Sequence, residues 1–135
     1  MPADTPNKPS SPPSGRDRRA YFRINVTLPM CIQAETDTTE GDFTQQSVNL
    51  SGGGIGVVVN RAYTPNDILV LSLLLPDHGL FKSHIEVLRM DPLPYHAGSY
   101  RLHAHFVRMT TQNRELLIRY VMRFQRDHLQ AHYSA

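Results

Sequence analysis

The chain has 135 residues, of which 40% are hydrophobic, and this length and composition predict a single domain with a small buried core. The formal net charge of +2 is too low for a nucleic-acid coat protein, yet twelve of the fourteen basic residues are arginine, which suits bidentate contacts with phosphate and guanine. Cys31 is the single cysteine, which excludes an internal disulfide framework and a multi-cysteine zinc site and favours a reducing compartment.

The first 15 residues hold five of the ten prolines together with Ser, Asp and Asn. Such a composition buries too little apolar area to offset the entropy of ordering, so residues 1–15 are predicted to be a disordered tail. The next eight residues, RDRRAYFR (16–23), carry four arginines immediately before the first predicted strand. Positive charge is therefore concentrated at the point where the tail meets the fold.

Alternation of apolar and polar residues predicts six short strands between residues 24 and 107. The second strand is expected over Phe43–Leu50, with a bulge near Gln45 and Gln46 because Phe43 and Val48 fall on opposite parities. Strands are also expected from Ile24 to Ile32, Ile55 to Val59, Ile68 to Leu75, Phe81 to Arg89 and Ser99 to Val107. Six short antiparallel strands predict a mainly β fold, a closed or split barrel.

The hydrophobic period changes to three and four residues near the end of the chain, which predicts an amphipathic helix over residues 111–131. Its apolar stripe consists of Leu117, Tyr120, Val121, Phe124 and His128. A terminal helix with one such stripe most simply packs on the barrel and covers or plugs an end.

No segment is predicted to cross a membrane. The longest apolar run, Ile68 to Leu75, is too short to span a bilayer, and the N-terminal stretch MPADTPNKPS lacks the apolar centre of a signal peptide. We therefore expect a cytoplasmic protein.

A pair of arginines is the first candidate binding motif. Arg19 and Arg23 lie four residues apart, and this spacing places both guanidinium groups on one side of an extended or helical segment, where they can hold one ligand together. The alternative is a solvated charge cluster beside a flexible tail.

The second candidate motif is NLSGGG, residues 49–54. Because Val48 and Leu50 point into the core, Asn49 and Ser51 are expected on the outward face, where they offer an amide and a hydroxyl side by side. Gly54 allows a close backbone approach or a positive φ angle. The alternative for these glycines is an ordinary hairpin turn.

Arg-x-x-x-Arg before the first barrel strand, followed by Asn-x-Ser-x-x-Gly at the close of the second, resembles the PilZ domain family, which binds the bacterial second messenger cyclic di-GMP. The resemblance includes GIGVVV, LHAHF and the helix, where RELLIRYVMRFQRD is similar to the PilZ domain of flagellar-brake proteins. It implies one PilZ domain over residues 16–135, made of a switch segment (16–23), a barrel (24–107) and the helix (111–131), without the extra N-terminal domain of flagellar-brake proteins.

By this resemblance, Arg19 and Arg23 bind phosphate and guanine, and the pocket is completed by Asn49, Ser51 and Gly54. Arginine forks match both phosphates and the O6/N7 edge of guanine. Arg18 projects opposite Arg19 in an extended segment and is expected to meet a second, stacked nucleotide; the alternative is a solvated side chain. The arginine segment is expected to be mobile without ligand and to fold across it on binding.

The sequence thus predicts a non-enzymatic receptor that passes the signal to an unidentified protein partner, with motility, exopolysaccharide or biofilm outputs implied by the family. We expect no cofactor beyond the ligand cyclic di-GMP, and no DNA or RNA partner. Neither a nucleophile elbow nor a dinucleotide fingerprint is present. His103 and His105 lie two apart on the last strand, but no third metal ligand accompanies them.

Two other functions are left open by the sequence. One is a nucleic-acid-binding barrel whose affinity falls steeply with salt. The other is an adaptor that contacts proteins through the barrel and helix and needs no ligand.

Overall fold

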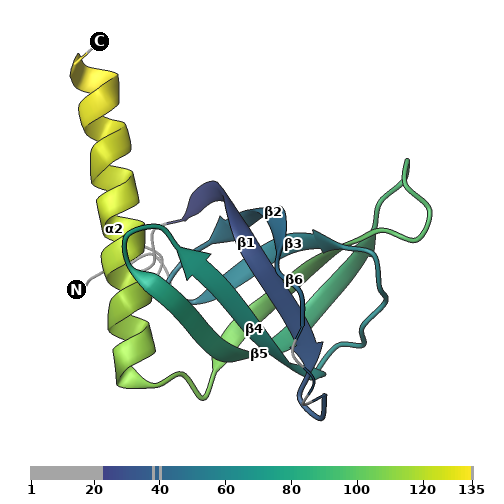
Figure 1. Cartoon of the computed structure of the whole chain (residues 1–135). Coiled ribbons are helices and arrows are strands. Elements are labelled where there is room, and N and C mark those ends of the chain that lie inside the picture. The colour runs from purple at the N-terminus through teal and green to yellow at the C-terminus, as the bar shows by residue number, and fades with distance from the viewer. Residues whose placement is uncertain (1–22, 38, 40, 135) are drawn as a thin grey trace, which may run out of the picture.

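The computed structural model of the chain describes residues 23–37, 39 and 41–134. The predicted tail (1–15), Arg18, Arg19 and the rest of the arginine segment before Arg23 lie outside the described residues. The elements are β1 (Ile24–Ala34), β2 (Thr44–Leu50), β3 (Gly54–Val59), β4 (Ile68–Leu75), β5 (Gly79–Pro92), β6 (Tyr100–Val107) and α2 (Thr111–Ser134) (Figure 1). The predicted mainly β class with a C-terminal helix is confirmed.

The six strands form a closed antiparallel barrel in the order β1-β2-β3-β6-β5-β4. Closure depends on β1, which is 11 residues long and pairs with β2 through Ile24–Met30 and with β4 through Met30–Ala34. Because one strand serves two neighbours, the sheet has no open edge at which another chain can add. The barrel is closed, which decides between the two forms predicted.

Alternating residues of all six strands fill the barrel interior. Leu28, Leu71, Phe81, Ile85 and Leu102 are fully buried there. Cys31 is also buried, but on the outer face of β1, where its Sγ lies beside Gly41, and this burial raises the pKa of its thiol and favours the protonated form. Since inward positions are apolar, the polar residues of the same strands lie on the outer surface.

The bulge predicted near Gln45 and Gln46 is wrong. β1 and β2 pair in continuous register from Met30 opposite Thr44 to Ile24 opposite Leu50. Phe43 precedes the strand and is 41% exposed. Its side chain therefore does not need to point inward, and no bulge is required to place it.

A β-bulge lies instead in β5. Val87 pairs with Ala104 and Arg89 with His103, which leaves Leu88 as the extra residue. Leu88 and Arg89 are therefore both exposed on the outer surface, although they are neighbours in the sequence. β5 also runs on to Pro92, beyond the predicted end at Arg89, because its pairing with β6 continues as far as Pro92 opposite Tyr100.

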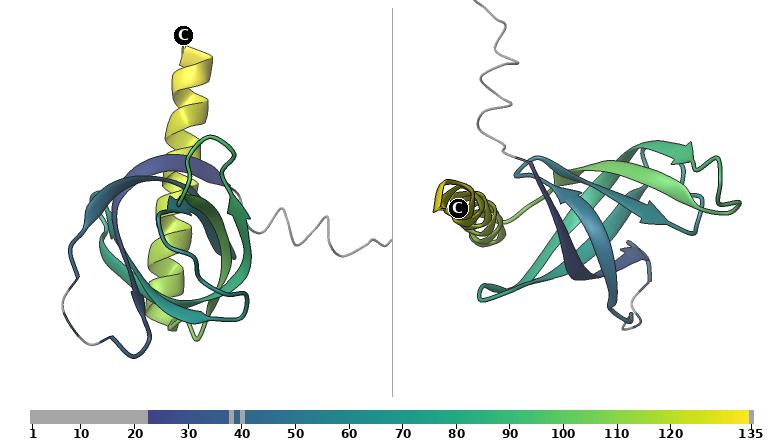
Figure 2. Two further views of the ribbon diagram at one scale, coloured as in Figure 1. Left: turned by 90° about the vertical axis from the view of Figure 1, so that its right-hand side faces the viewer. Right: turned by 90° about the horizontal axis from the view of Figure 1, so that it is seen from above.

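Helix α2 packs across one end of the barrel (Figure 2), as predicted. It begins at Thr111 and is capped by Thr110, whose Oγ1 accepts a hydrogen bond from the N–H of Asn113 at 3.1 Å. Leu117, Tyr120 and Val121 join the barrel core. The predicted stripe is wrong at its last position, because His128 is exposed and stacks on Phe124.

The helix extends to Ser134, three residues beyond the predicted end. In the part of the chain that the structure describes, no helix is both long and apolar enough to cross a membrane.

Replacing Leu117 with Ala is expected to lower the free energy of unfolding by about 2–5 kcal/mol, because the fully buried side chain leaves a cavity between helix and barrel. Met122→Ala is the matched control, since Met122 is 53% exposed and its loss is expected to change stability by no more than about 0.5 kcal/mol. Urea unfolding followed by circular dichroism measures both. Equal losses in the two variants would show that Leu117 does not anchor the helix.

Candidate ligand-binding site

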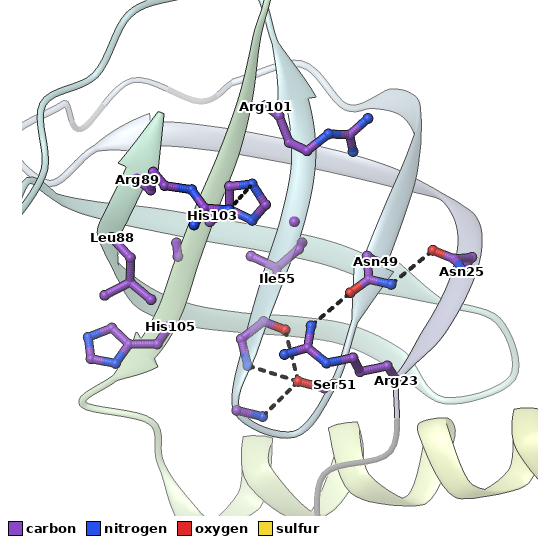
Figure 3. A pocket seen from close by; sticks show the side chains of 14 residues that line it. Arg23, Asn25, Asn49, Ser51, Ile55, Leu88, Arg89, Arg101, His103 and His105 are labelled. Atoms are coloured by element: carbon purple, nitrogen blue, oxygen red, sulfur yellow. Dashed lines mark hydrogen bonds between the residues drawn. The ribbon is translucent and has the colours of Figure 1, made fainter. Parts of the chain in front are cut away.

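One cavity on the outer surface of the barrel brings together the described residues of both sequence motifs. Its volume is about 890 Å³, within the range of small-molecule sites. Arg23, Asn49, Ser51 and Gly54 line it, and Figure 3 labels the first three of these. Arg18 and Arg19 lie outside the described residues, so their part in this site stays a prediction.

The register of the strands explains how the floor of the cavity forms. Asn25 pairs with Asn49, Asn49 with Gly56, Gly56 with His103, and His103 with Arg89. Because residues paired across antiparallel strands share a face, these five form one outward row across β1, β2, β3, β6 and β5. Gly56 has no side chain, so the middle of the row is open backbone between two polar sides.

Gly54 is required by the packing of β3 on β6. A Cβ atom at this position would collide with the backbone oxygen of Ala104, which cannot move without breaking the sheet. A Cβ at Gly56 would meet its nearest neighbour, the Cβ of Asn49, at an ordinary 3.7 Å. The two glycines therefore differ: Gly54 allows the close backbone approach predicted from the sequence, and Gly56 leaves the surface hollow.

Ser51 differs from its prediction as a free outward hydroxyl. Its side chain borders the cavity, but the residue is only 5% exposed. The Ser51 Oγ accepts hydrogen bonds from the backbone N–H groups of Gly53 and Gly54, each at 3.2 Å. The Ser51 hydroxyl thus holds the glycine turn in place, and its contribution to the site is the shape of that turn.

Arg23 and Asn49 are hydrogen-bonded to each other on the side of the cavity floor that lies away from β5. Arg23 Nη1 donates a hydrogen bond to Asn49 Oδ1 at 3.1 Å, and Asn49 Nδ2 donates to Asn25 Oδ1 at 2.9 Å (Figure 3). These bonds fix the orientation of the Asn49 amide. Because the partner of Arg23 is a neutral amide, the positive charge of this exposed guanidinium is not cancelled by the contact.

The side of the cavity formed by β5 and β6 was not recognised as part of the site from the sequence. Leu88, Arg89, Arg101, His103 and His105 line it. The spacing of the two histidines indicated a shared face, but the closeness of His103 to Arg89 depends on the strand order and on the β5 bulge, which no local pattern revealed.

Carboxylates hold several of these side chains from outside the cavity. Asp91 Oδ2 lies 2.9 Å from Arg89 Nε and 3.3 Å from His103 Nε2, and Glu86 Oε1 lies 2.8 Å from His105 Nε2. Among the described residues there is no cluster of three or more metal-ligating side chains, so the histidine pair gains no third ligand.

The described residues that line the cavity include three arginines and neither aspartate nor glutamate. Arginine forks in such a setting form charge-assisted hydrogen bonds with phosphate and with the O6/N7 edge of guanine. Such side chains can bind an anionic ligand that also has planar polar groups.

The family model of the PilZ domain matches residues 17–123. This chain belongs to the PilZ domain family. A comparison with curated protein sequences found no match.

Solved structures similar to this PilZ domain share its fold at low sequence identity. They include the Bacillus subtilis inhibitor of motility MotI/DgrA, with a TM-score of 0.65 and 23% identity over 82% of this chain and 52% of that one. The present chain thus spans about half the length of MotI/DgrA. The PilZ domain of Escherichia coli YcgR, solved with c-di-GMP, has a TM-score of 0.62 and 16% identity over 87% of this chain and 99% of that one. A tetrameric PilZ protein from Xanthomonas campestris has a TM-score of 0.65 and 13% identity, with coverages of 87% and 97%.

Gly54→Ala is expected to lower the free energy of unfolding by about 1–3 kcal/mol, because the new methyl group forces β3 away from Ala104. Gly56→Ala is the matched control, and we expect it to be neutral or to stabilise the domain by about 0.4–1 kcal/mol, since the unfolded chain loses freedom and the surface accommodates the methyl group. Urea denaturation of both variants measures the difference. The steric explanation is wrong if Gly54→Ala proves as stable as Gly56→Ala.

Proposed function

We propose that this PilZ domain is a non-enzymatic receptor for cyclic di-GMP, bound in the cavity that joins Arg23 and Asn49 to the glycine turn. The observation that carries the proposal is that Arg23 of the first motif lines the same cavity as the second motif, in a chain of the PilZ family, and that no carboxylate is among the described lining residues. Similar solved structures include the YcgR PilZ domain with c-di-GMP and the MrkH–c-di-GMP complex from K. pneumonia.

The groups at this cavity suit the chemistry of the ligand. Cyclic di-GMP carries two anionic phosphates and two guanines, and the Arg23 guanidinium can form paired hydrogen bonds with either. Asn49 Oδ1 accepts one hydrogen bond from Arg23 and keeps a second lone pair for a guanine N–H group. The bare backbone at Gly56 gives a flat ring room to approach the sheet.

The segment before Arg23 supplies the rest of the proposed site. Arg19 lies four residues before Arg23, so its Cα lies within about 14 Å of the Arg23 Cα in any conformation of the chain. We propose that Arg19 binds the same ligand, that Arg18 meets a second stacked nucleotide, and that the segment becomes ordered when the ligand binds. A protein partner then recognises the ordered form, with an output in motility, exopolysaccharide production or biofilm formation.

Titration of cyclic di-GMP into the full chain by calorimetry tests the proposal. Wild-type protein is expected to bind cyclic di-GMP in preference to GTP and the linear dinucleotide. Arg23→Ala is expected to weaken binding by about ten- to a hundredfold, because a charge-assisted hydrogen bond contributes about 1.5–3 kcal/mol. Arg119→Ala, which removes an exposed helix arginine, is the charge-matched control and is expected to bind as wild type does.

Absence of wild-type binding at low salt would overturn the receptor proposal and favour the adaptor function. Binding that is indifferent to cyclisation of the nucleotide and falls steeply with salt would favour the nucleic-acid-binding barrel. A stoichiometry of one ligand per chain would remove the proposed role of Arg18.

The open floor at Gly56 gives a separate test of where the ligand lies. Gly56→Val is expected to fold, because the position is in a strand and faces outward, but its branched side chain fills the space between Asn49 and His103. We expect at least a tenfold loss of cyclic di-GMP affinity in the same titration, with an unfolding midpoint in urea close to that of wild type. Unchanged affinity would place the ligand elsewhere on the barrel.

A further inference from the structure

The β5–β6 side of the cavity has no role in the proposed function as derived from the two motifs. Its polar members are Arg89, Arg101, His103 and His105, and we call this set the β5–β6 wall. The wall faces the Arg23–Asn49 side across the bare backbone of β3, so a ligand lying on that floor meets both sides (Figure 3).

Arg101 is the most available cation of the β5–β6 wall. It is exposed, and its side chain extends from β6 over β3 toward the side of the cavity that holds Asn49 (Figure 3). Arg89, by contrast, is held by Asp91 at 2.9 Å. Within the described part of the chain, no carboxylate forms an ion pair with Arg101. An anion that enters the cavity therefore need not displace a described carboxylate to reach this guanidinium.

His103 has two partners that compete for the same nitrogen atom. Arg89 Nη2 lies 3.3 Å from His103 Nε2, and Asp91 Oδ2 lies 3.3 Å from the same Nε2. A neutral imidazole with a free Nε2 accepts from Arg89, whereas a protonated imidazole donates to Asp91 and can no longer accept. Protonation therefore adds a positive charge to the cavity and frees one N–H group of Arg89.

Charged or titratable groups lie near His103 on β5, on β6 and just before β1. β5 contributes Arg89 and Asp91, and also Glu86, which contacts His105. β6 contributes Arg101 and His105. β3 contributes Gly56 and no charge, and Arg23 stands at the start of β1 across the floor. An anionic ligand in this setting favours the protonated imidazole, and imidazole is the side chain that changes charge between about pH 5 and 8.

Stability gives little reason for these contacts. The side chains of Arg89 and Asp91 are 65% and 45% exposed, and ion pairs so exposed contribute little to folding. Substitutions in the β5–β6 wall are therefore expected to leave the barrel folded, which makes binding measurements on them interpretable.

We propose that the β5–β6 wall is the second half of the ligand site, in which Arg101 binds a phosphate or guanine of the cyclic dinucleotide and protonation of His103 strengthens binding. This inference rests on the proposed function and deepens it, because it adds a second set of ligand contacts and a dependence on pH. Affinity rises as the pH falls, since the bound anion and the protonated imidazole attract each other.

The first arm of the test is a titration of cyclic di-GMP into the full chain carrying Arg101→Ala. We expect the dissociation constant to rise by about tenfold or more, as for the loss of a charge-assisted hydrogen bond. Arg119→Ala controls for the change in net charge. Arg23→Ala shows the effect of losing a contact on the Arg23–Asn49 side of the cavity. Urea unfolding of each variant confirms that the domain is intact.

The second arm compares wild type and His103→Gln at about pH 8 and about pH 5.5. A unit charge about 6 Å from a phosphate in water is worth roughly threefold in affinity, so wild type is expected to bind at least about threefold tighter at the lower pH. His103→Gln keeps a polar side chain that does not titrate, and we expect a smaller change. His105→Gln, whose imidazole pairs with Glu86, shows how much of the remaining pH dependence comes from that residue.

The outcomes separate the two proposals. If wild type does not bind cyclic di-GMP, both the proposed function and the proposed role of the β5–β6 wall are overturned. If wild type binds and Arg23→Ala does not, but Arg101→Ala binds as wild type does, the receptor function stands and the inference about the wall is overturned. A pH dependence that is the same in wild type and His103→Gln removes His103 from the site.

Discussion

The candidate site depends on the absence of side chains at two outward positions of β3. Gly54 allows the β3 backbone to approach Ala104 of β6, and Gly56 leaves the next outward position bare. These two positions let the polar residues of β1 and β2 face those of β6 and β5 over a shallow floor instead of being separated by a ridge. The cavity is therefore a consequence of barrel closure combined with two missing side chains, and Ser51 secures it by holding the turn that leads into Gly54.

The charges around this floor contribute little to folding. Arg23 contacts only a neutral amide within the described residues, and Asp91 and Glu86 hold Arg89, His103 and His105 from outside the cavity. Like charges gathered in one hollow repel each other, and a bound anion relieves this repulsion. Stability comes instead from the apolar interior and from the helix residues that complete it, so the surface is free to carry an unbalanced charge.

Sequence patterns predicted the elements of the fold well because alternation and helical period report directly on burial. They failed where a residue's role depends on tertiary pairing. Phe43 was assigned to a strand by its hydrophobicity, although its side chain is exposed and lies before the strand. The β5 bulge at Leu88 is defined only by the register of β5 with β6. The motif residues Asn49 and Gly54 could be named from the sequence, whereas Arg101 could not, because its nearness to Asn49 requires the order β2-β3-β6. The orientation of the Ser51 hydroxyl was missed because local bonding to the glycine turn outweighs strand parity.

The closed barrel also bears on where a receptor of this design can change shape. Every strand is paired on both sides, and the interior side chains and the inner face of α2 form one continuous core, so rearranging the barrel would expose apolar surface and break ladder hydrogen bonds. Arg23, in contrast, stands at the first described position before β1, where the cavity and the preceding chain meet. A ligand that contacts Arg23 on one side and the β5–β6 wall on the other can be held by a rigid floor while it acts on the segment that carries Arg18 and Arg19. A conformational response within the barrel would carry the cost of rearranging its core, which is why we place the proposed switch before β1.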